Sequence, residues 1–150
     1  MIEIKPICRF RLRDLEPGAK EFYASSKHLH AFDIGRFVAF WKNVIEAQLG
    51  IIIVAIDDGE IIGAIAGMVV PEPYSAGTAV HEFFWFVRPG HRGTAGVRLY
   101  KALEKWARDK NATVIRMVHL LDSMPEKLER FYGAMGYTAV ETLYSKDLAA

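Results

Sequence analysis

The spacing of hydrophobic residues changes along the chain, and these changes mark where helices and strands are expected. Over residues 16–48 the apolar residues recur mostly every three or four positions, the period of a helix that packs one face against a core. We predict one helix around Phe22 and a second over 37–49, with Gly50 as its stop. Beyond Gly50 the apolar residues form continuous runs, which are typical of buried strands.

A hairpin is the clearest local signal in the middle of the chain. The apolar runs 51–56 and 61–70 flank the tetrapeptide Asp57-Asp58-Gly59-Glu60, a combination that favours two antiparallel strands joined by a tight turn. A strand dense in aromatic residues follows over 79–87 and stops at Arg88-Pro89-Gly90.

The remaining segments complete an alternating order of elements. We expect a first strand within 1–10, a helix over 95–111, a strand over 113–120, a helix that starts around Pro125 and ends near Gly136, and a last strand from Tyr137 to Tyr144. The predicted order is β-α-α-β-β-β-α-β-α-β, an α/β fold built on one mixed sheet. A chain of 150 residues favours a single domain over 1–150.

Composition and charge narrow the class of protein. The formal net charge is +1, so bulk charge gives no reason to expect a nucleic-acid partner, and no apolar stretch reaches the ~20 residues of a membrane helix. The first ten residues lack the pattern of a signal peptide, and a cytoplasmic protein is expected. Cys8, the only cysteine, excludes an internal disulfide and a multi-cysteine zinc site. We expect Cys8 to be buried in strand packing.

The segment 81–110 carries the clearest chemical signal, because a strand runs into a helix through a short loop rich in small residues. Small residues allow a phosphate to approach the unpaired N–H groups at a helix N-terminus. The small residues are Gly90, Gly93, Ala95 and Gly96, and nearby positive charge comes from Arg88, His91, Arg92 and Arg98. The pattern predicts an anion site suited to a diphosphate; the alternative is a tight glycine turn with solvated arginines.

Two motifs resemble those of the GNAT superfamily of acyl-CoA N-acyltransferases. The stretch 87–93, Val-Arg-Pro-Gly-His-Arg-Gly, matches the first half of the family segment V-x-P-x-x-R-G-x-G-x-G-x-x-L. The second half departs, because the next glycine, Gly96, and Leu99 each come one residue early. Residues 128–137 are similar to the signature A-x-x-F-Y-x-x-x-G-F, with Tyr137 in place of phenylalanine.

The resemblance implies a sheet that is splayed between the fourth and fifth strands, and acetyl-CoA or another acyl-CoA as the donor. In this family the backbone at the end of the fourth strand pairs with the pantetheine arm, and the following loop wraps the pyrophosphate. The residues implied for acyl-CoA binding are Trp85, Phe86, Val87, Arg92, Gly93, Thr94, Ala95, Gly96 and Val97. The side chains at 84–86 have core packing as their alternative.

The resemblance also implies two catalytic residues. Tyr132 corresponds to the family's tyrosine near the thioester sulfur; its alternative is a packed aromatic side chain. Reference pKa values of ~10 for tyrosine and ~8.5 for a thiol favour a hydrogen bond to the thiolate over proton transfer. An attacking amine must be neutral, and Glu82 on the strand before the loop is the predicted general base. His81 points to the opposite face, and His119 is the alternative base.

The resemblance implies an amine acceptor, and the residues fit a small-molecule amine and a protein amine equally well. The resemblance places the acceptor site in Leu15–Gln48 and Pro71–Thr78, whose candidate residues are Phe22, Tyr23, His28, His30, Phe32, Asp33, Arg36 and Tyr74. We interpret His28 and His30 as solvated loop residues and expect no metal site. Alternative functions are an acyl-CoA-binding or regulatory module without turnover, and a protein- or tRNA-directed acetyltransferase. A homodimer is expected only because many family members form one.

Overall fold

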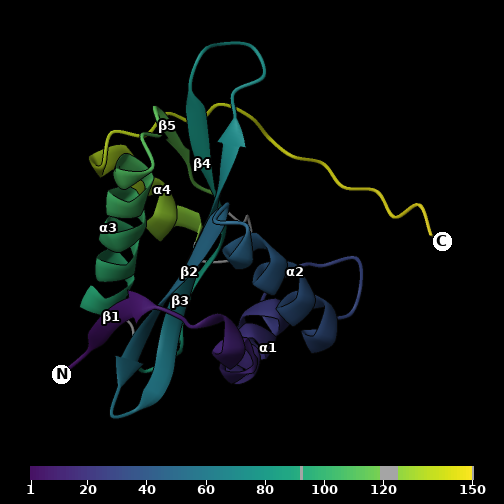
Figure 1. Ribbon diagram of the computed structural model, residues 1–150, viewed down its shortest axis with the longest axis vertical. Coiled ribbons are helices and arrows are strands. Elements are labelled where there is room, and N and C mark those ends of the chain that lie inside the picture. Colours follow the sequence, from purple (N-terminus) through teal and green to yellow (C-terminus); the bar gives the residue numbers. More distant parts are fainter. Residues whose placement is uncertain (92, 119–124, 150) are drawn as a thin grey trace.

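The computed structural model describes residues 1–91, 93–118 and 125–149 (Figure 1). In chain order the elements are β1 (Glu3–Pro6), the 3-10 helix η1 (Arg9–Leu15), α1 (Glu16–Ala24), α2 (Ile34–Glu46), β2 (Gly50–Asp57), β3 (Glu60–Pro71), β4 (Thr78–Val87), α3 (Thr94–Asp109), β5 (Val114–Arg116) and α4 (Pro125–Ala134). The predicted α/β class and the order of its first nine elements are confirmed, with η1 added between the first strand and the first helix.

The five strands form one mixed sheet in the order β1-β2-β3-β4-β5. The first three pairs of neighbours are antiparallel, and β4 pairs with β5 in parallel. The predicted hairpin joins β2 to β3, and its central residues Asp58 and Gly59 have φ values of 48° and 82°. Two successive positive φ angles are what a two-residue hairpin turn of the favoured twist requires.

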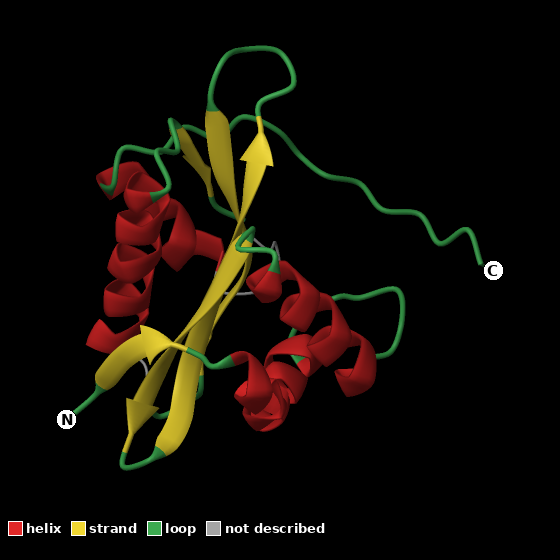
Figure 2. Ribbon diagram, in the orientation of Figure 1, coloured by secondary structure: helices red, strands yellow, loops and turns green. Residues whose placement is uncertain are grey.

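Helices cover both faces of the sheet (Figure 2). One core cluster lies between the sheet and α3 and includes Ile53, Ile65 and Leu103. The other lies against η1 and α2 and includes Ile52 and Trp41. Neighbouring residues of β2 therefore point into different cores, which explains why this strand reads as a continuous apolar run.

The sheet splays between β4 and β5, as the resemblance implied. β4 extends from Thr78 to Val87, but it pairs with β5 only over Ala79–His81. In the part of the chain that the structure describes, no further strand lies against the β5 side of residues 83–86. The predicted strand over 113–120 is shorter in the structure, where β5 covers three residues.

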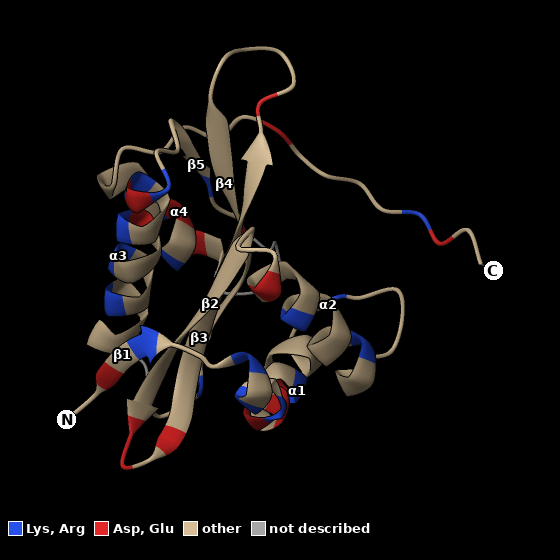
Figure 3. Ribbon diagram, viewed as in Figure 1, with Lys and Arg blue, Asp and Glu red and all other residues tan. Residues whose placement is uncertain are grey.

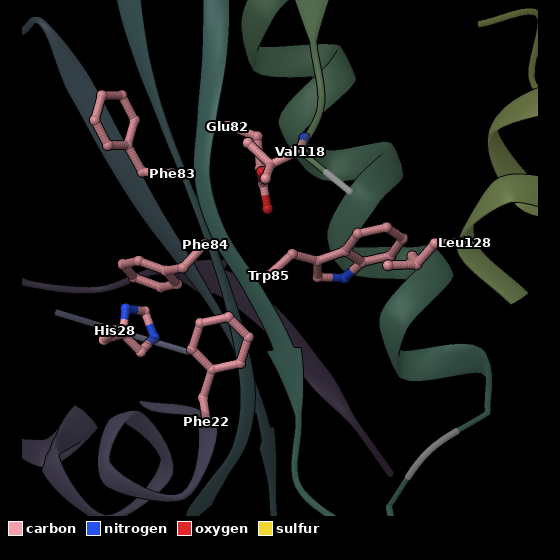
Figure 4. A pocket seen from close by; sticks show the side chains of 8 residues that line it. All are labelled: Phe22, His28, Glu82, Phe83, Phe84, Trp85, Val118 and Leu128. Atoms are coloured by element: carbon pink, nitrogen blue, oxygen red, sulfur yellow. Dashed lines mark hydrogen bonds between the residues drawn. The ribbon is translucent and has the colours of Figure 1, made fainter. Parts of the chain in front are cut away.

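A β-bulge interrupts the pairing of β3 with β4. Ala66 lies opposite Phe84 and Gly67 opposite Glu82, so Phe83 is an extra residue in β4. Phe83 and Phe84 both contact Trp41 on the α2 side. Because two consecutive residues share that face, Glu82 and Trp85 both fall on the opposite one (Figure 4).

Three predictions are wrong in detail. Residues 137–149 are described but contain no strand, and they run away from the sheet (Figure 1). The edge strand β5 is too short to pair with a strand over Tyr137–Tyr144. Cys8 is exposed, because β1 ends at Pro6 and Cys8 falls in the connection to η1. Gly50 is the first residue of β2, and the chain leaves α2 through Gln48, whose φ is 58°.

Candidate active site

A long groove runs along the splayed half of β4. It has a volume of about 200 Å³ and lies between the end of β4, the first turn of α3, α1 and α4. Its lining residues are Gly18, Glu21, Phe22, Ser25, Trp85, Phe86, Val87, Arg88, Pro89, Gly93, Gly96, Val97, Lys127, Leu128 and Phe131. The groove therefore follows the strand edge that β5 leaves uncovered and ends at a helix N-terminus.

The N-terminus of α3 is open toward this groove. Gly93 precedes the helix with a φ of 145° and no side chain caps the helix start in the described part of the chain. A Cβ placed on Gly90 or Gly93 would meet no atom within 4 Å, so the loop leaves space beside the first backbone N–H groups. Those groups and the positive end of the helix dipole suit an anion.

The charged side chains at the groove are partly paired. Arg88 donates two hydrogen bonds to the carboxylate of Glu21, at 2.8 and 3.0 Å, and so links the end of β4 to α1. The Arg88 guanidinium lowers the pKa of Glu21. Lys127 of α4 also lines the groove, and Lys and Arg residues recur along α3 (Figure 3). The positive charge near the groove comes from several elements rather than from the loop alone.

A small cavity of about 90 Å³ adjoins the long groove (Figure 4). It is lined by Phe22, His28, Glu82, Phe83, Phe84, Trp85, Val118 and Leu128. The two spaces share Phe22, Trp85 and Leu128, so a group bound in one lies next to a group bound in the other.

Glu82 is the acidic group of the small cavity. Only 6% of its surface is exposed, and its Oε2 accepts a hydrogen bond from the backbone N–H of Val118 at 3.1 Å. Burial raises the pKa of the Glu82 carboxyl to about 8, although the bond from Val118 lowers it. The side chain extends from β4 toward the space between Phe84 and Trp85 (Figure 4). A carboxyl in this state titrates near neutral pH, as a general acid or base requires.

Tyr132 lies on the other side of Val118. Its hydroxyl donates a hydrogen bond to the Val118 carbonyl at 2.7 Å, while the N–H of the same residue donates to Glu82. Burial raises the pKa of Tyr132 above its ordinary value, and the charge of Glu82 raises it further. Tyr132 therefore keeps its proton and acts as a hydrogen-bond donor. The backbone N–H and carbonyl of a single residue, Val118, therefore connect the two predicted catalytic side chains.

A family model described as the Acetyltransferase (GNAT) family matches residues 12–137. The chain belongs to the GNAT family of acetyltransferases. This finding confirms the resemblance seen in the two sequence motifs, both of which lie within the matched residues. No curated protein matches the sequence.

Solved structures of other GNAT proteins have a similar fold. A predicted acetyltransferase from Clostridium acetobutylicum, solved with acetyl-CoA, has a TM-score of 0.81 and 14% identity over 99% of this chain and 97% of that chain. Ribosomal-protein-alanine N-acetyltransferase from Brucella melitensis has a TM-score of 0.75 and 16% identity, over 98% and 99% of the two chains. Glucosamine-6-phosphate N-acetyltransferase from Arabidopsis thaliana has a TM-score of 0.75 and 15% identity, over 99% of each. At these identities the likeness shows the fold alone.

The GNAT residues implied for acyl-CoA binding lie mostly along the long groove. Six line it: Trp85, Phe86, Val87, Gly93, Gly96 and Val97. Thr94 is exposed at the helix start, and the Ala95 side chain is buried in the core beneath α3. Arg92 lies outside the described residues.

The two histidines that were weighed beside Glu82 as the general base lie apart from its carboxyl or outside the described residues. His81 is in hydrogen-bond distance of Arg116, at 3.3 Å, and Arg116 in turn pairs with Glu72. His119 lies outside the described residues. Among the residues that are described, no group of three potential metal ligands occurs, and no helix is long and apolar enough to cross a membrane.

Three features of this site were missed at the level of sequence. The bulge at Phe83, the bridging role of Val118 and the contribution of Leu128 have no local signal. A bulge depends on the register of two strands, and a backbone bridge depends on which residue ends a neighbouring strand. The consecutive phenylalanines at 83 and 84 are the only hint, since strict alternation would place one of them away from α2.

Proposed function

We propose that this GNAT protein transfers the acetyl group of acetyl-CoA to a primary amine by direct attack in a ternary complex. Glu82 serves as the general base and Tyr132 as a hydrogen-bond donor to the departing sulfur. One observation carries the proposal: the long groove and the small cavity meet at Trp85, with a buried carboxyl on the cavity side. That arrangement brings a donor and an acceptor together at one wall.

The long groove has the features that an acyl-CoA needs. The strand edge of β4 beyond its contact with β5 offers backbone groups to an extended arm, as an added strand would. The open start of α3 offers N–H groups to a diphosphate, and Lys127 adds a positive charge along the same groove. Acetyl-CoA supplies the acyl carbon and a sulfur leaving group.

Glu82 makes the amine nucleophilic. An amine of pKa ~10.4 is almost wholly protonated near neutral pH, so it must first lose a proton. The ionised Glu82 carboxylate accepts that proton, directly or through a water molecule. The nitrogen lone pair then forms the C–N bond, the C–S bond breaks, and the electron pair leaves with the sulfur. The sulfur takes the second proton of the nitrogen and leaves as a thiol, and Glu82 returns its proton to solvent.

Tyr132 stabilises the negative charge that develops on the sulfur. Because its pKa is raised, it donates a hydrogen bond rather than giving up the proton. In the structure this hydroxyl donates to the Val118 carbonyl, so we expect it to turn toward the sulfur when the donor is bound. The Val118 bond holds the hydroxyl near Glu82 until then.

The first test is a calorimetric titration with acetyl-CoA. Val97 lies in the first turn of α3 and lines the groove, so Val97→Glu puts a negative charge where the diphosphate is expected. A carboxylate is favourable at a helix start, so the fold should tolerate it. We expect micromolar binding by the wild-type protein, weakened at least about tenfold in Val97→Glu. The matched neutral variant, Val97→Gln, should lose much less.

The outcomes separate the functions expected from the sequence. Equal affinity in the two Val97 variants would place the diphosphate elsewhere and contradict the groove assignment. Binding of acetyl-CoA without turnover of any amine would favour the alternative of a binding or regulatory module. The single domain, the cytoplasmic location and the homodimer stay predictions from sequence.

A further inference from the structure

We propose that the small cavity selects a primary amine carried on a compact apolar group, with no second charge on the part that enters. This inference rests on the proposed function, since the amine needs an acyl donor in the adjoining groove. It narrows the acceptor from any primary amine to one chemical class.

Most of the described lining of the small cavity is aromatic or aliphatic, and its polar side-chain groups are the Glu82 carboxyl and the ring nitrogens of His28 and Trp85. Phe22, Phe83, Phe84 and Trp85 surround it, and Leu128 adds an aliphatic side. The space is open on one side, and the part within its walls has a volume of about 90 Å³, below the ~150 Å³ that accommodates a benzene molecule in an engineered apolar cavity. Such a space fits a short branched alkyl chain better than a sugar ring with its many hydroxyl groups.

The aromatic walls are held in place by neighbouring rings. Phe83 and Phe84 each meet Trp41 edge-on, with ring centroids 5.7 Å apart in both cases. Phe22 stacks on Phe86 at 5.7 Å. Because these contacts fix the rings before any ligand arrives, the cavity keeps its shape and can discriminate between acceptors.

The far wall comes from the connection between α1 and α2. His28 lines the cavity there, and its ring lies parallel to that of Tyr23, with centroids 3.6 Å apart. The Tyr23 hydroxyl donates a hydrogen bond to the backbone oxygen of His30, which ties the same connection to α1. The wall opposite Glu82 is therefore also held by defined contacts.

The small cavity offers one carboxyl group, that of Glu82, to the single nitrogen of the acceptor. No other carboxyl occurs among the described residues that line it. A second ammonium on the acceptor would lie among the rings with no carboxylate of its own, and a carboxylate would face both the rings and Glu82. Burying an unpaired charge is costly, so both additions should weaken binding. The long groove differs, since Arg88, Glu21 and Lys127 all line it.

Phe83 is the residue that tests this selection. It lines the small cavity but not the long groove, and 49% of its surface is exposed, so its removal leaves the core largely intact. Phe40 on α2 is a matched control. It is 48% exposed, it also meets Trp41 edge-on at 5.3 Å, and it lines neither space.

The experiment measures release of the CoA thiol with three acceptors of similar length. Isopentylamine carries one amine on a branched alkyl chain, 1,4-diaminobutane adds a second ammonium, and 4-aminobutanoate adds a carboxylate. We expect kcat/KM for isopentylamine to exceed the other two by about tenfold or more. Phe83→Ala should lower the value for isopentylamine by about five- to tenfold, with unchanged affinity for acetyl-CoA, and Phe40→Ala should change it less than about twofold.

The results distinguish this inference from the proposed function. If acetyl-CoA does not bind, the proposed function fails and the inference falls with it. If acetyl-CoA binds and 1,4-diaminobutane or 4-aminobutanoate is the better acceptor, the inference is wrong while the acetyltransferase stands. Equal losses in the Phe83 and Phe40 variants, or binding of acetyl-CoA with no turnover of isopentylamine, would also overturn it.

Discussion

The long groove and the small cavity share three lining residues but differ in the groups that a ligand would contact. The groove includes a large backbone contribution from an uncovered strand edge, a glycine loop and the first turn of a helix. The cavity is defined by side chains, four of them aromatic and one a buried carboxyl. A backbone site depends on the course of the chain and tolerates many side chains, whereas each residue of the cavity alters what fits. Donor binding and acceptor choice should therefore respond to different substitutions.

Glu82→Gln should give the largest difference between an effect on the reaction rate and an effect on acetyl-CoA binding. The amide keeps an oxygen that can accept the Val118 hydrogen bond but cannot take a proton from the amine. We expect kcat to fall about 10²- to 10³-fold while the affinity for acetyl-CoA stays the same. Steady-state rates and calorimetry on one preparation test this. A variant that retains full kcat would remove Glu82 from the mechanism.

The pH dependence of the wild-type rate should report the same carboxyl. Only the ionised form of Glu82 accepts a proton, and its pKa is raised to about 8. At saturating amine, kcat should fall about tenfold for each pH unit well below 8 and level off above it. The Glu82→Gln profile should lack this bend. An identical bend in both proteins would assign it to another group.

Tyr132→Phe should have a smaller effect on the rate. The variant loses a hydrogen-bond donor to the sulfur but leaves the base and both spaces in place, so we expect kcat to fall about tenfold. It also leaves the Val118 carbonyl without this partner, at a cost of about 1 kcal/mol in the free energy of unfolding. Tyr100→Phe, which removes the hydroxyl that contacts Tyr137, is the matched control and should keep kcat near the wild-type value.

The two spaces also differ in how far the sequence predicted them. The glycines and the strand-to-helix switch that form the groove are contiguous, and the GNAT segment over 87–93 identified them directly. The cavity combines β4, α1, α4 and the chain after β5, which meet only in the folded protein. Alternation correctly separated Glu82 from His81, but the bulge at Phe83 then changed the face of every later residue in β4.

The C-terminal residues show that a strand can also be predicted where none forms. Residues 137–144 have a composition suited to a strand, yet they form none, because a strand also needs an edge of matching length. The first nine elements could be predicted since each carries its own period or turn signal. The predicted last strand carries no such signal, because its formation depends on the length of β5.

The free energy of unfolding should also depend on the burial of Glu82. The folded protein holds this proton up to about pH 8, whereas an exposed carboxyl in the unfolded chain loses it near pH 4.5. Between these values the unfolded chain binds fewer protons, so wild-type stability falls as pH rises, by at most about 1.4 kcal/mol per pH unit. The Glu82→Gln side chain does not titrate, so the variant should lose less stability over the same range. The difference in the free energy of unfolding between the variant and the wild type should therefore shift in favour of the variant from pH 5 to pH 8. Denaturant unfolding of both proteins at several pH values measures the difference. Parallel curves would mean that Glu82 is ionised in the folded protein across this range, and the rate bend near pH 8 would then need another origin.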